Sequence, residues 1–489
     1  MELTTTTPIA VLVAALLVGL GPVRALPALF AVLPLGSAAA FNLPAVGNSS
    51  ILVSDIAACT FIAVVLASRR HVEAIVANCR PGAPGFFLAS MLAVGLVVTL
   101  FAPRIFAGTT DVFAIGRQGG EVGVVIRPLG PGSGNITQGF RLSLGVLVFL
   151  TCAAVLKPVL DDRRVVLAFL AATTVNVALA AYDFATYAVS APELMAWLRT
   201  ANYTILDHHE IAGVKRIIGD FPEASAFGYF SVGLFGFWCK YWLTGGRMRH
   251  GVFVLAAALA MVLLSGSSAA FVALAAFLTI TFAGILLATD LRRIPRRIAV
   301  AVGLCVLLLP FAAAVGWILL QTSSGFSEYF DRLLFSKLES DSAIERGSWN
   351  SQALQNFVET WMLGAGLGSV RASNFVIAVL SSIGVAGAVL YVGFFYALAR
   401  AKAPRLPNES AAITSGCRAA CLILVLKAFV TKSTPDLEVP FFLYAGAAFA
   451  YASFSISKVD ASLLPRPAKP AWMVGRGDLR GMSRVRSRQ

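Results

Sequence analysis

The sequence predicts an all-α polytopic membrane protein, and two observations carry that prediction. Apolar residues make up 58% of the 489-residue chain and charged residues 13%, with a mean hydropathy of +0.79. Soluble domains average about 45–50% apolar and about 25% charged residues. In addition, apolar stretches of about 20 residues, long enough for a helix to cross a bilayer, recur along the chain. The composition therefore excludes a soluble globular protein.

About thirteen spans are expected within residues 1–457. The first is interpreted as a span rather than a cleaved signal peptide, because residues 1–8 lack the basic region that precedes the apolar core of a signal peptide. The expected spans are residues 8–21, 25–41, 51–67, 86–103, 140–158, 165–190, 226–243, 251–266, 269–289, 298–320, 373–399, 413–430 and 440–456.

Lys and Arg are concentrated in the short loops that follow alternate spans. The formal net charge of +14 would suggest a nucleic-acid partner in a soluble protein, but basic cytoplasmic loops are the usual pattern in membrane proteins. No nucleic acid is therefore expected, and the C-terminus is placed on the cytoplasmic side. The basic segments are residues 68–85, 157–164, 244–251, 289–297 and 399–410 and the tail, 458–489.

The remaining loops then lie on the opposite side of the membrane: residues 104–139, 191–225, 265–268, 321–371 and 431–440. Residues 321–371 form the longest polar interruption, and loops longer than about 15 residues are usually functional or disordered. Helical periodicity within this loop favours a function. Residues 104–139 contain an alternating apolar run followed by Pro and Gly residues, which predicts a small hairpin that covers the bundle.

The loop at residues 191–225 gathers charged and imidazole side chains just before the chain re-enters the membrane. Guanidinium groups bind phosphate oxygens bidentately and stay charged, so cations at the bilayer surface suit a lipid-linked phosphate. Solvation of an exposed loop is the alternative explanation. The candidate residues in this loop are His208, His209, Lys215, Arg216 and Glu223.

A second basic centre, Arg346, lies in the large loop at the start of an expected amphipathic helix. The apolar positions Trp349, Ala353, Leu354, Phe357, Val358 and Trp361 follow helical spacing. Such a helix would lie along the membrane interface with its Trp residues at headgroup depth. The following GAGLGS run, residues 364–369, is interpreted as a flexible hinge in preference to a phosphate-binding loop.

No cysteine or histidine spacing predicts a metal site, and no cofactor is expected. The seven cysteines fall in expected spans or on the cytoplasmic side, so disulfides are not expected. Ionisable residues within spans are few: Asp183 and Lys427, with Asp55 near the outer end of a span. A transporter would depend on such charges, whereas polar pairing between helices is the alternative. The sequence also shows no matching pair of broken spans, which weighs against a secondary transporter.

Three segments carry a family resemblance that spans roughly residues 200–400. They are KRIIGDFPEASAFGYF (215–230), LLSGSSAAFVALAAFL (263–278), and residues 345–390, which include ERGSWNSQAL and WMLGAGLGS. These segments resemble, in the same order, the arginine-containing loop, the Ser-Arg-Gly span and the signature region of the O-antigen ligases and the O-antigen and exopolysaccharide polymerases. Those are bacterial inner-membrane proteins with a large periplasmic loop that contains helices.

The resemblance implies an inverting, metal-independent glycosyltransferase that uses a polyprenyl-diphosphate-linked oligosaccharide as donor. Arginines would stabilise the diphosphate as it leaves. Arg216 and Arg346 match the family's arginine positions, so they are expected to be catalytic. Lys215, His208, Glu223, Arg371 and Asn374 are the expected substrate-binding residues.

Two positions depart from the family pattern. Ser373-Asn374 stands where ligases have His-Asn, and Ser267-Ser268 stands where many members have Ser-Arg. A general base contributes about 10²–10⁴-fold. His209 or His208 could supply it because imidazole titrates near neutrality, with Glu223 and Glu345 as alternatives.

We therefore expect a polymerase that joins repeat units at the periplasmic face during surface-polysaccharide or exopolysaccharide biosynthesis. The alternatives are an O-antigen ligase that transfers glycan to a lipid or protein acceptor, and a flippase for lipid-linked sugars. Membrane lipids, a chain-length regulator and export proteins are the further expected partners.

Overall fold

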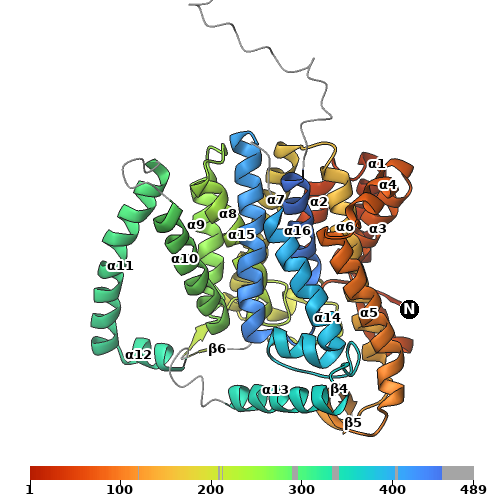
Figure 1. Cartoon of the computed structure of the whole chain (residues 1–489). Helices are drawn as coiled ribbons and strands as arrows, with labels where there is room; N and C mark the ends of the chain where they lie inside the picture. The colour runs from red at the N-terminus through yellow and green to blue at the C-terminus, as the bar shows by residue number, and fades with distance from the viewer. Residues whose placement is uncertain are drawn as a thin grey trace, which may run out of the picture. The chain divides into compact units, whose positions relative to one another are not determined.

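The computed structural model describes residues 1–118, 121–206, 210–211, 213–288, 296–332, 341–401 and 406–453. Residues Met1–Ser453 form one compact unit. The expected basic tail, residues 458–489, lies outside the described residues. The described chain is mostly helical, and Figure 1 shows most of the long helices side by side in a bundle.

Every expected span except the second coincides with an α-helix, which confirms the helical prediction. Among the described residues, six helices are long and apolar enough to cross a membrane: α5 (Pro84–Ile105), α6 (Ser133–Leu156), α7 (Asp162–Ala188), α10 (Ser268–Ala288), α14 (Phe375–Arg400) and α15 (Asn408–Thr431). The other helices at expected spans are α1 (Thr7–Leu20), α3 (Val53–Leu66), α8 (Ala224–Leu243), α9 (Gly251–Leu264), α11 (Arg296–Thr322) and α16 (Glu438–Ala452).

The second expected span, residues 25–41, is not a continuous helix. Here α2 (Leu26–Ala31) ends after 6 residues, and the chain then enters β2 (Ala39–Leu43). Pro34 and Gly36 lie between them, and both residue types disfavour a continuing helix. Strand β2 pairs antiparallel with β1 (Glu2–Leu3) and β3 (Ser49–Leu52). The stretch still passes from one end of the bundle to the other. The carbonyl oxygen of Arg24 accepts from Arg164 in a basic loop, and the amide of Ala39 donates to Thr200 in the loop at residues 191–225.

Small antiparallel pairs also occur in the expected outside loops. Strands β4 (Asp111–Gln118) and β5 (Glu121–Pro128) form the hairpin expected within residues 104–139, which confirms that prediction. A shorter pair, β6 (Glu210–Ile211) and β7 (Val214–Lys215), precedes α8. The bundle itself is therefore all-α, with small sheets in its connections. The short connecting helices are η1 (Pro44–Val46), α4 (Arg69–Asn78), η2 (Pro192–Met195), α12 (Ser324–Phe330) and α13 (Asp341–Glu359).

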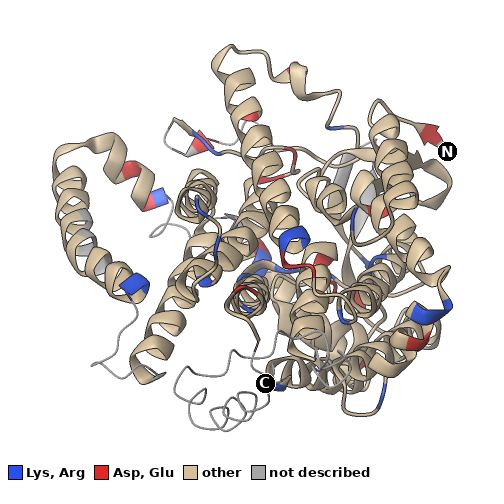
Figure 2. Cartoon of the chain, turned by 90° about the horizontal axis from the view of Figure 1, so that it is seen from above, with Lys and Arg blue, Asp and Glu red and all other residues tan. Residues whose placement is uncertain are grey.

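The core of the bundle is formed by α6, α8, α15 and α16. Helix α8 packs on α15, and α6 packs on α16. Close approach depends on small residues: a Cβ on Gly236 of α8 would lie 3.0 Å from the carbonyl oxygen of Ala419 on α15. Seen from above, most of the ribbon carries neither Lys or Arg nor Asp or Glu, as Figure 2 shows. Charge within the bundle is thus confined to a few positions.

The GAGLGS run packs against a break in α14, which corrects its interpretation as a hinge. Gly384 interrupts α14 with a φ of 66°, and the amides of Ala365 and Gly366 donate to the carbonyls of Ser381 and Ser382 at 2.8 and 3.0 Å. A Cβ on Gly384 would lie 2.3 Å from the carbonyl oxygen of Leu363. The glycines therefore allow two backbones to touch and lock the end of the large loop onto the bundle.

Candidate anion-binding site

A cavity of about 420 Å³ lies where four of the expected outside loops meet. Segments that are far apart in the sequence line it together. They are residues 206–225, 266–269, 332–349 with 371–373, and 431–433. Arginines outnumber carboxylates in this lining, which makes it net positive. The charged residues are Arg216, Glu223, Arg332, Glu345, Arg346 and Arg371.

Arg216 enters the cavity from the loop between β7 and α8. Its Nε donates to the carbonyl oxygen of Ser265 at 3.4 Å. Gly266 has a φ of +54°, and a Cβ there would lie 3.2 Å from Cγ of Arg216, so the arginine stem lies on this turn. Burial lowers the pKa of Arg216 and the neighbouring Glu223 opposes that shift. Because arginine ordinarily titrates above about 12, the group remains a cation at neutral pH.

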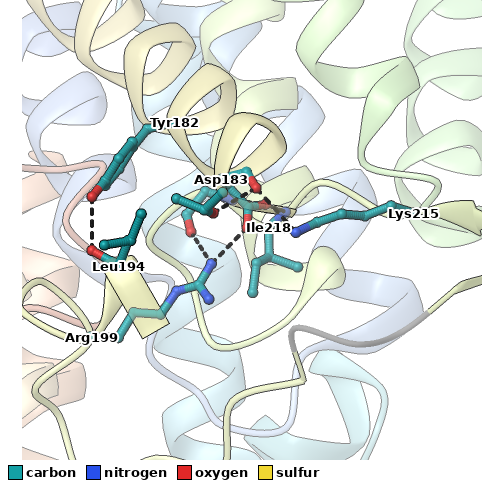
Figure 3. A network of polar contacts seen from close by, with 8 residues as sticks. Tyr182, Asp183, Leu194, Arg199, Lys215 and Ile218 are labelled. Atoms are coloured by element: carbon teal, nitrogen blue, oxygen red, sulfur yellow. Dashed lines mark hydrogen bonds and ion pairs between the residues drawn. The ribbon is translucent and has the colours of Figure 1, made fainter. Parts of the chain in front are cut away.

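Lys215, the neighbour of Arg216, points the other way and does not line this cavity. Its Nζ lies 3.0 Å from Oδ1 of Asp183 on α7, and its side chain is 5% exposed. Arg199 donates to the same carboxylate oxygen at 2.8 Å, as Figure 3 shows. Lys215 was expected to bind substrate, but in the structure its charge is used in a buried ion pair.

Asp183 also holds the backbone that follows Arg216. Its Oδ2 accepts hydrogen bonds from the amides of Ile218 at 2.9 Å and Gly219 at 3.2 Å. With Lys215 on one side of Arg216 and these amides on the other, the loop is tied to α7 at both ends (Figure 3). This intramembrane carboxylate therefore positions the loop that presents Arg216.

Arg346 lies on α13, which crosses one end of the bundle beside β4 and β5 (Figure 1). The helix begins at Asp341, earlier than the sequence indicates. It is anchored on the hairpin, since Asn356 donates to Oγ1 of Thr110 at 2.6 Å and to the carbonyl oxygen of Asp111 at 2.7 Å. The Arg346 side chain forms no ion pair with the residues that the structure describes, and its charge is available to a ligand.

The apolar face expected for α13 is divided between two sides. Trp349 and Ala353 are buried against the protein, at 8% and 0% exposure, together with Asn356. Leu354 and Val358 remain exposed on the other side, and Trp361, also exposed, lies beyond the end of the helix at Glu359. The periodicity was correct for a helix, but it did not distinguish the residues that face the bundle from those that face outward.

Arg371 reaches the cavity from the segment before α14. Its guanidinium lies over the ring of Trp349, with 4.4 Å from Cζ to the ring centroid. Burial lowers the pKa of this arginine, partly opposed by Glu223 and Glu345. Its Nε is buried and has no hydrogen-bond partner among the described residues. An oriented guanidinium with an unused donor is what a bound anion would satisfy.

Of the remaining expected site residues, Glu223 lines the cavity and Asn374 does not. Asn374 caps α14, accepting from the amides of Val376 and Ile377 at 2.9 and 3.3 Å, and donates to the carbonyl oxygen of Phe429 at 2.8 Å. Its neighbour Ser373 lines the cavity instead. His208 and His209 lie outside the described residues.

Residues that the sequence did not single out as ligands complete the wall. They are small hydroxyl side chains at the ends of helices and in the turns between them: Ser225, Thr431 and Ser433, with Ser267 and Ser268 from the motif noted above. An isolated Ser or Thr at such a position has no distinctive sequence pattern, so only the packing of these segments around the cavity identifies them.

No protein-family model and no curated protein matches this chain. The chemistry of the cavity is therefore the basis for a functional proposal. Arg216, Arg346 and Arg371, three of the four arginines in the lining, come from separate segments, and together with the surrounding hydroxyls they would suit an anion with several oxygens.

Proposed function

We propose that the protein is a glycan polymerase that joins lipid-diphosphate-linked oligosaccharide repeat units. The observation that carries this proposal is the convergence of Arg216, Arg346 and Arg371 on one cavity at the end of a bundle of apolar helices. A donor lipid would keep its chain in the membrane and its diphosphate in this cavity. The exposed apolar side of α13, followed two residues beyond its end by Trp361 at 74% exposure, suits a helix at the membrane interface.

The arginines would act on the charge that develops in the leaving group. When the bond between the anomeric carbon and the diphosphate oxygen breaks, its electron pair moves to the diphosphate. Arg216 and Arg371 are held in place before the reaction, one by the loop tied to Asp183 and the other by Trp349. Donors that need no reorganisation stabilise such charge most effectively.

The attacking group is a hydroxyl of the acceptor glycan, whose oxygen forms the new bond to the anomeric carbon and inverts it. Its proton passes to a base, and we assign that role to Glu223. This carboxylate lines the cavity and interacts electrostatically with both Arg216 and Arg371. Glu345, the other lining carboxylate, lies on an exposed position of α13.

The same proposal sets the orientation in a bacterial inner membrane. Residues 25–41 cross the bundle as a short helix and an extended segment, because Arg24 lies beside Arg164 and Ala39 beside Thr200. Residues 39–52 therefore lie on the side of the other outer loops. Asn48 from this segment lines a cavity with Asn202 and Thr434, which belong to those loops. Strand β1 pairs with β2, and Thr5 donates to the carbonyl oxygen of Trp197, so the start of the chain lies with the outer loops. With about thirteen crossings, the C-terminal end of the described chain lies on the cytoplasmic side and the cavity faces the periplasm.

The test is complementation of a deletion strain with Arg346→Ala, Arg371→Ala and Glu223→Gln. We expect loss of polymer with single repeat units retained, measured as glycan length on gels at matched membrane levels. Arg69→Ala, which removes an exposed arginine paired with Glu73, is the matched control and should leave polymer length unchanged.

Other outcomes would identify the alternatives. Full-length polymer left on its lipid carrier would indicate a ligase. If the three variants made normal polymer while Lys427→Met abolished it, a flippase would be favoured, because Lys427 is a buried intramembrane charge.

A further inference from the structure

A second cavity of about 560 Å³ lies beside the arginine cavity and has different chemistry. Its volume falls in the range of about 300–1,000 Å³ typical of ligand sites. Amide and hydroxyl side chains line most of it, including Asn48, Thr137, Gln138, Asn202 and Thr434. Such groups donate and accept hydrogen bonds without net charge, which suits a ligand with many hydroxyls.

The charged residues of this cavity are largely satisfied within the protein. Arg141 donates to the hydroxyl of Tyr203 at 2.8 Å, and Lys432 forms an ion pair with Glu438. Asp436 accepts from the amide of Glu438 at 3.0 Å. With Arg127, three cations face two carboxylates here, a smaller excess than the four arginines and two carboxylates of the arginine cavity. Carboxylates placed in this way can still accept hydrogen bonds from sugar hydroxyls.

One extended segment separates the two cavities. Thr431 and Ser433 line the arginine cavity, whereas Lys432 and Thr434 line the second cavity, and Ser433 borders both. Lys432 has extended backbone angles, φ −75° and ψ 130°, so successive side chains face opposite sides. The two cavities therefore share Ser433 as a common border.

We infer that the second cavity binds the oligosaccharide of the acceptor, so that its attacking hydroxyl reaches the arginine cavity past Ser433. This inference rests on the proposed function. The free amide of Gln138, which forms no hydrogen bond to the described protein, and the hydroxyl of Thr434 are available to the sugar. An amide or hydroxyl contact of this kind contributes about 0.5–1.5 kcal/mol.

The test uses the full-length protein in nanodiscs and two probes. The first is a short oligosaccharide cut by mild acid from the host's own surface polysaccharide, and the second is inorganic pyrophosphate. Binding of each is measured by calorimetry. We expect Gln138→Ala and Thr434→Val each to weaken oligosaccharide binding roughly 2- to 10-fold and to leave pyrophosphate binding unchanged. Gln355→Ala, on the exposed side of α13 and bonded to Glu359, is the matched control.

Unchanged pyrophosphate binding shows that the variants are folded. Absence of oligosaccharide binding to the wild-type protein, or equal binding to the Gln138 and Thr434 variants, would overturn the inference. Loss of pyrophosphate binding is expected instead for Arg346→Ala. If Arg346→Ala binds pyrophosphate normally, the proposed function fails while the carbohydrate site stands.

A third probe separates acceptor from donor. In the donor, the sugar at the reducing end lies at the diphosphate, whereas the acceptor attacks with another hydroxyl. Reduction of the probe's terminal sugar to an alditol should therefore leave binding unchanged. Weaker binding of the reduced probe would assign the cavity to the donor glycan and overturn the acceptor assignment.

Discussion

At the scale of single residues, neighbours of like charge have unlike roles. Lys215 and Arg216 are adjacent cations, yet one is paired with Asp183 inside the bundle and the other lines the arginine cavity. A short extended segment sends successive side chains to opposite sides. Likewise, Ser373 lines the arginine cavity, whereas its neighbour Asn374 caps α14.

Asp220, four residues after Arg216, makes stability depend on pH. It is fully buried, and burial raises its pKa to about 7 from 3.8, a shift that Arg199 opposes and Asp183 reinforces. The folded state therefore holds a proton that the unfolded state releases above about pH 4. The free energy of unfolding should fall as pH rises from about 4 to about 7 and then level off.

The measurement is thermal unfolding in detergent at pH 5 and pH 8. The wild-type protein should lose stability at the higher pH by at most about 3 kcal/mol, because only the interval from pH 5 to the folded pKa of about 7 contributes. Asp220→Asn, which cannot ionise, should lose much less. Parallel pH profiles for the two proteins would show that Asp220 does not titrate in this range.

At the scale of elements, two helices have features that their apolar patterns do not show. Helix α14 is broken where the GAGLGS run touches its backbone, and α13 buries Asn356 while exposing Val358. In both cases a contact with a distant segment replaces the regular pattern. Asn135 on α6 contributes to the same junction, donating to the carbonyl of Leu367 at 2.7 Å.

Gly384 should therefore tolerate no side chain. Its φ is 66° and a Cβ would lie 2.3 Å from a carbonyl oxygen. We expect Gly384→Ala to destabilise the protein by about 3 kcal/mol or more, since both strain and a clash are introduced. Gly316→Ala in α11, where a Cβ meets open space, should be neutral or stabilising by up to about 1 kcal/mol. Equal melting temperatures for the two variants would refute this account of the junction.

At the scale of the whole molecule, the connections at one end of the bundle form two adjoining cavities of different chemistry. The arginine cavity suits a diphosphate, and the amide-rich cavity suits a glycan. The segment of residues 431–434 is the wall between them. Separate sites for the leaving group and the attacking group would hold the two substrates in a productive orientation, which reduces the entropy of reaching the transition state.

Ser433 tests this arrangement, because it borders both cavities. Ser433→Phe should block passage between them and abolish polymer formation, while pyrophosphate and oligosaccharide each still bind. Ser433→Ala keeps the space open and should retain most activity. The readouts are glycan length in the complemented strain and calorimetry with each probe. Normal polymer from Ser433→Phe would mean that the substrates do not meet past this residue.

The sequence by itself determined most of the helices, because apolar stretches of membrane length and the loops between them follow from composition and charge. It also singled out Arg216, Arg346, Arg371 and Glu223. It did not show that the helix within residues 25–41 is broken, because hydropathy reports burial and not helix continuity. The sequence also did not predict that Lys215 pairs with Asp183 or that Asn374 caps α14. The ion pair depends on a partner distant in the chain, and the cap depends on local backbone geometry.

Only the tertiary structure decided which charged residues share a site. Arg346 lies about 130 residues from Arg216 along the chain, and no local pattern states that α13 crosses the bundle end to bring them together. The second cavity is a still clearer case, because its lining comes from hydroxyl and amide residues that are common in any loop. Local composition predicts where a helix can form, whereas a binding site requires the long-range packing that sets its residues side by side.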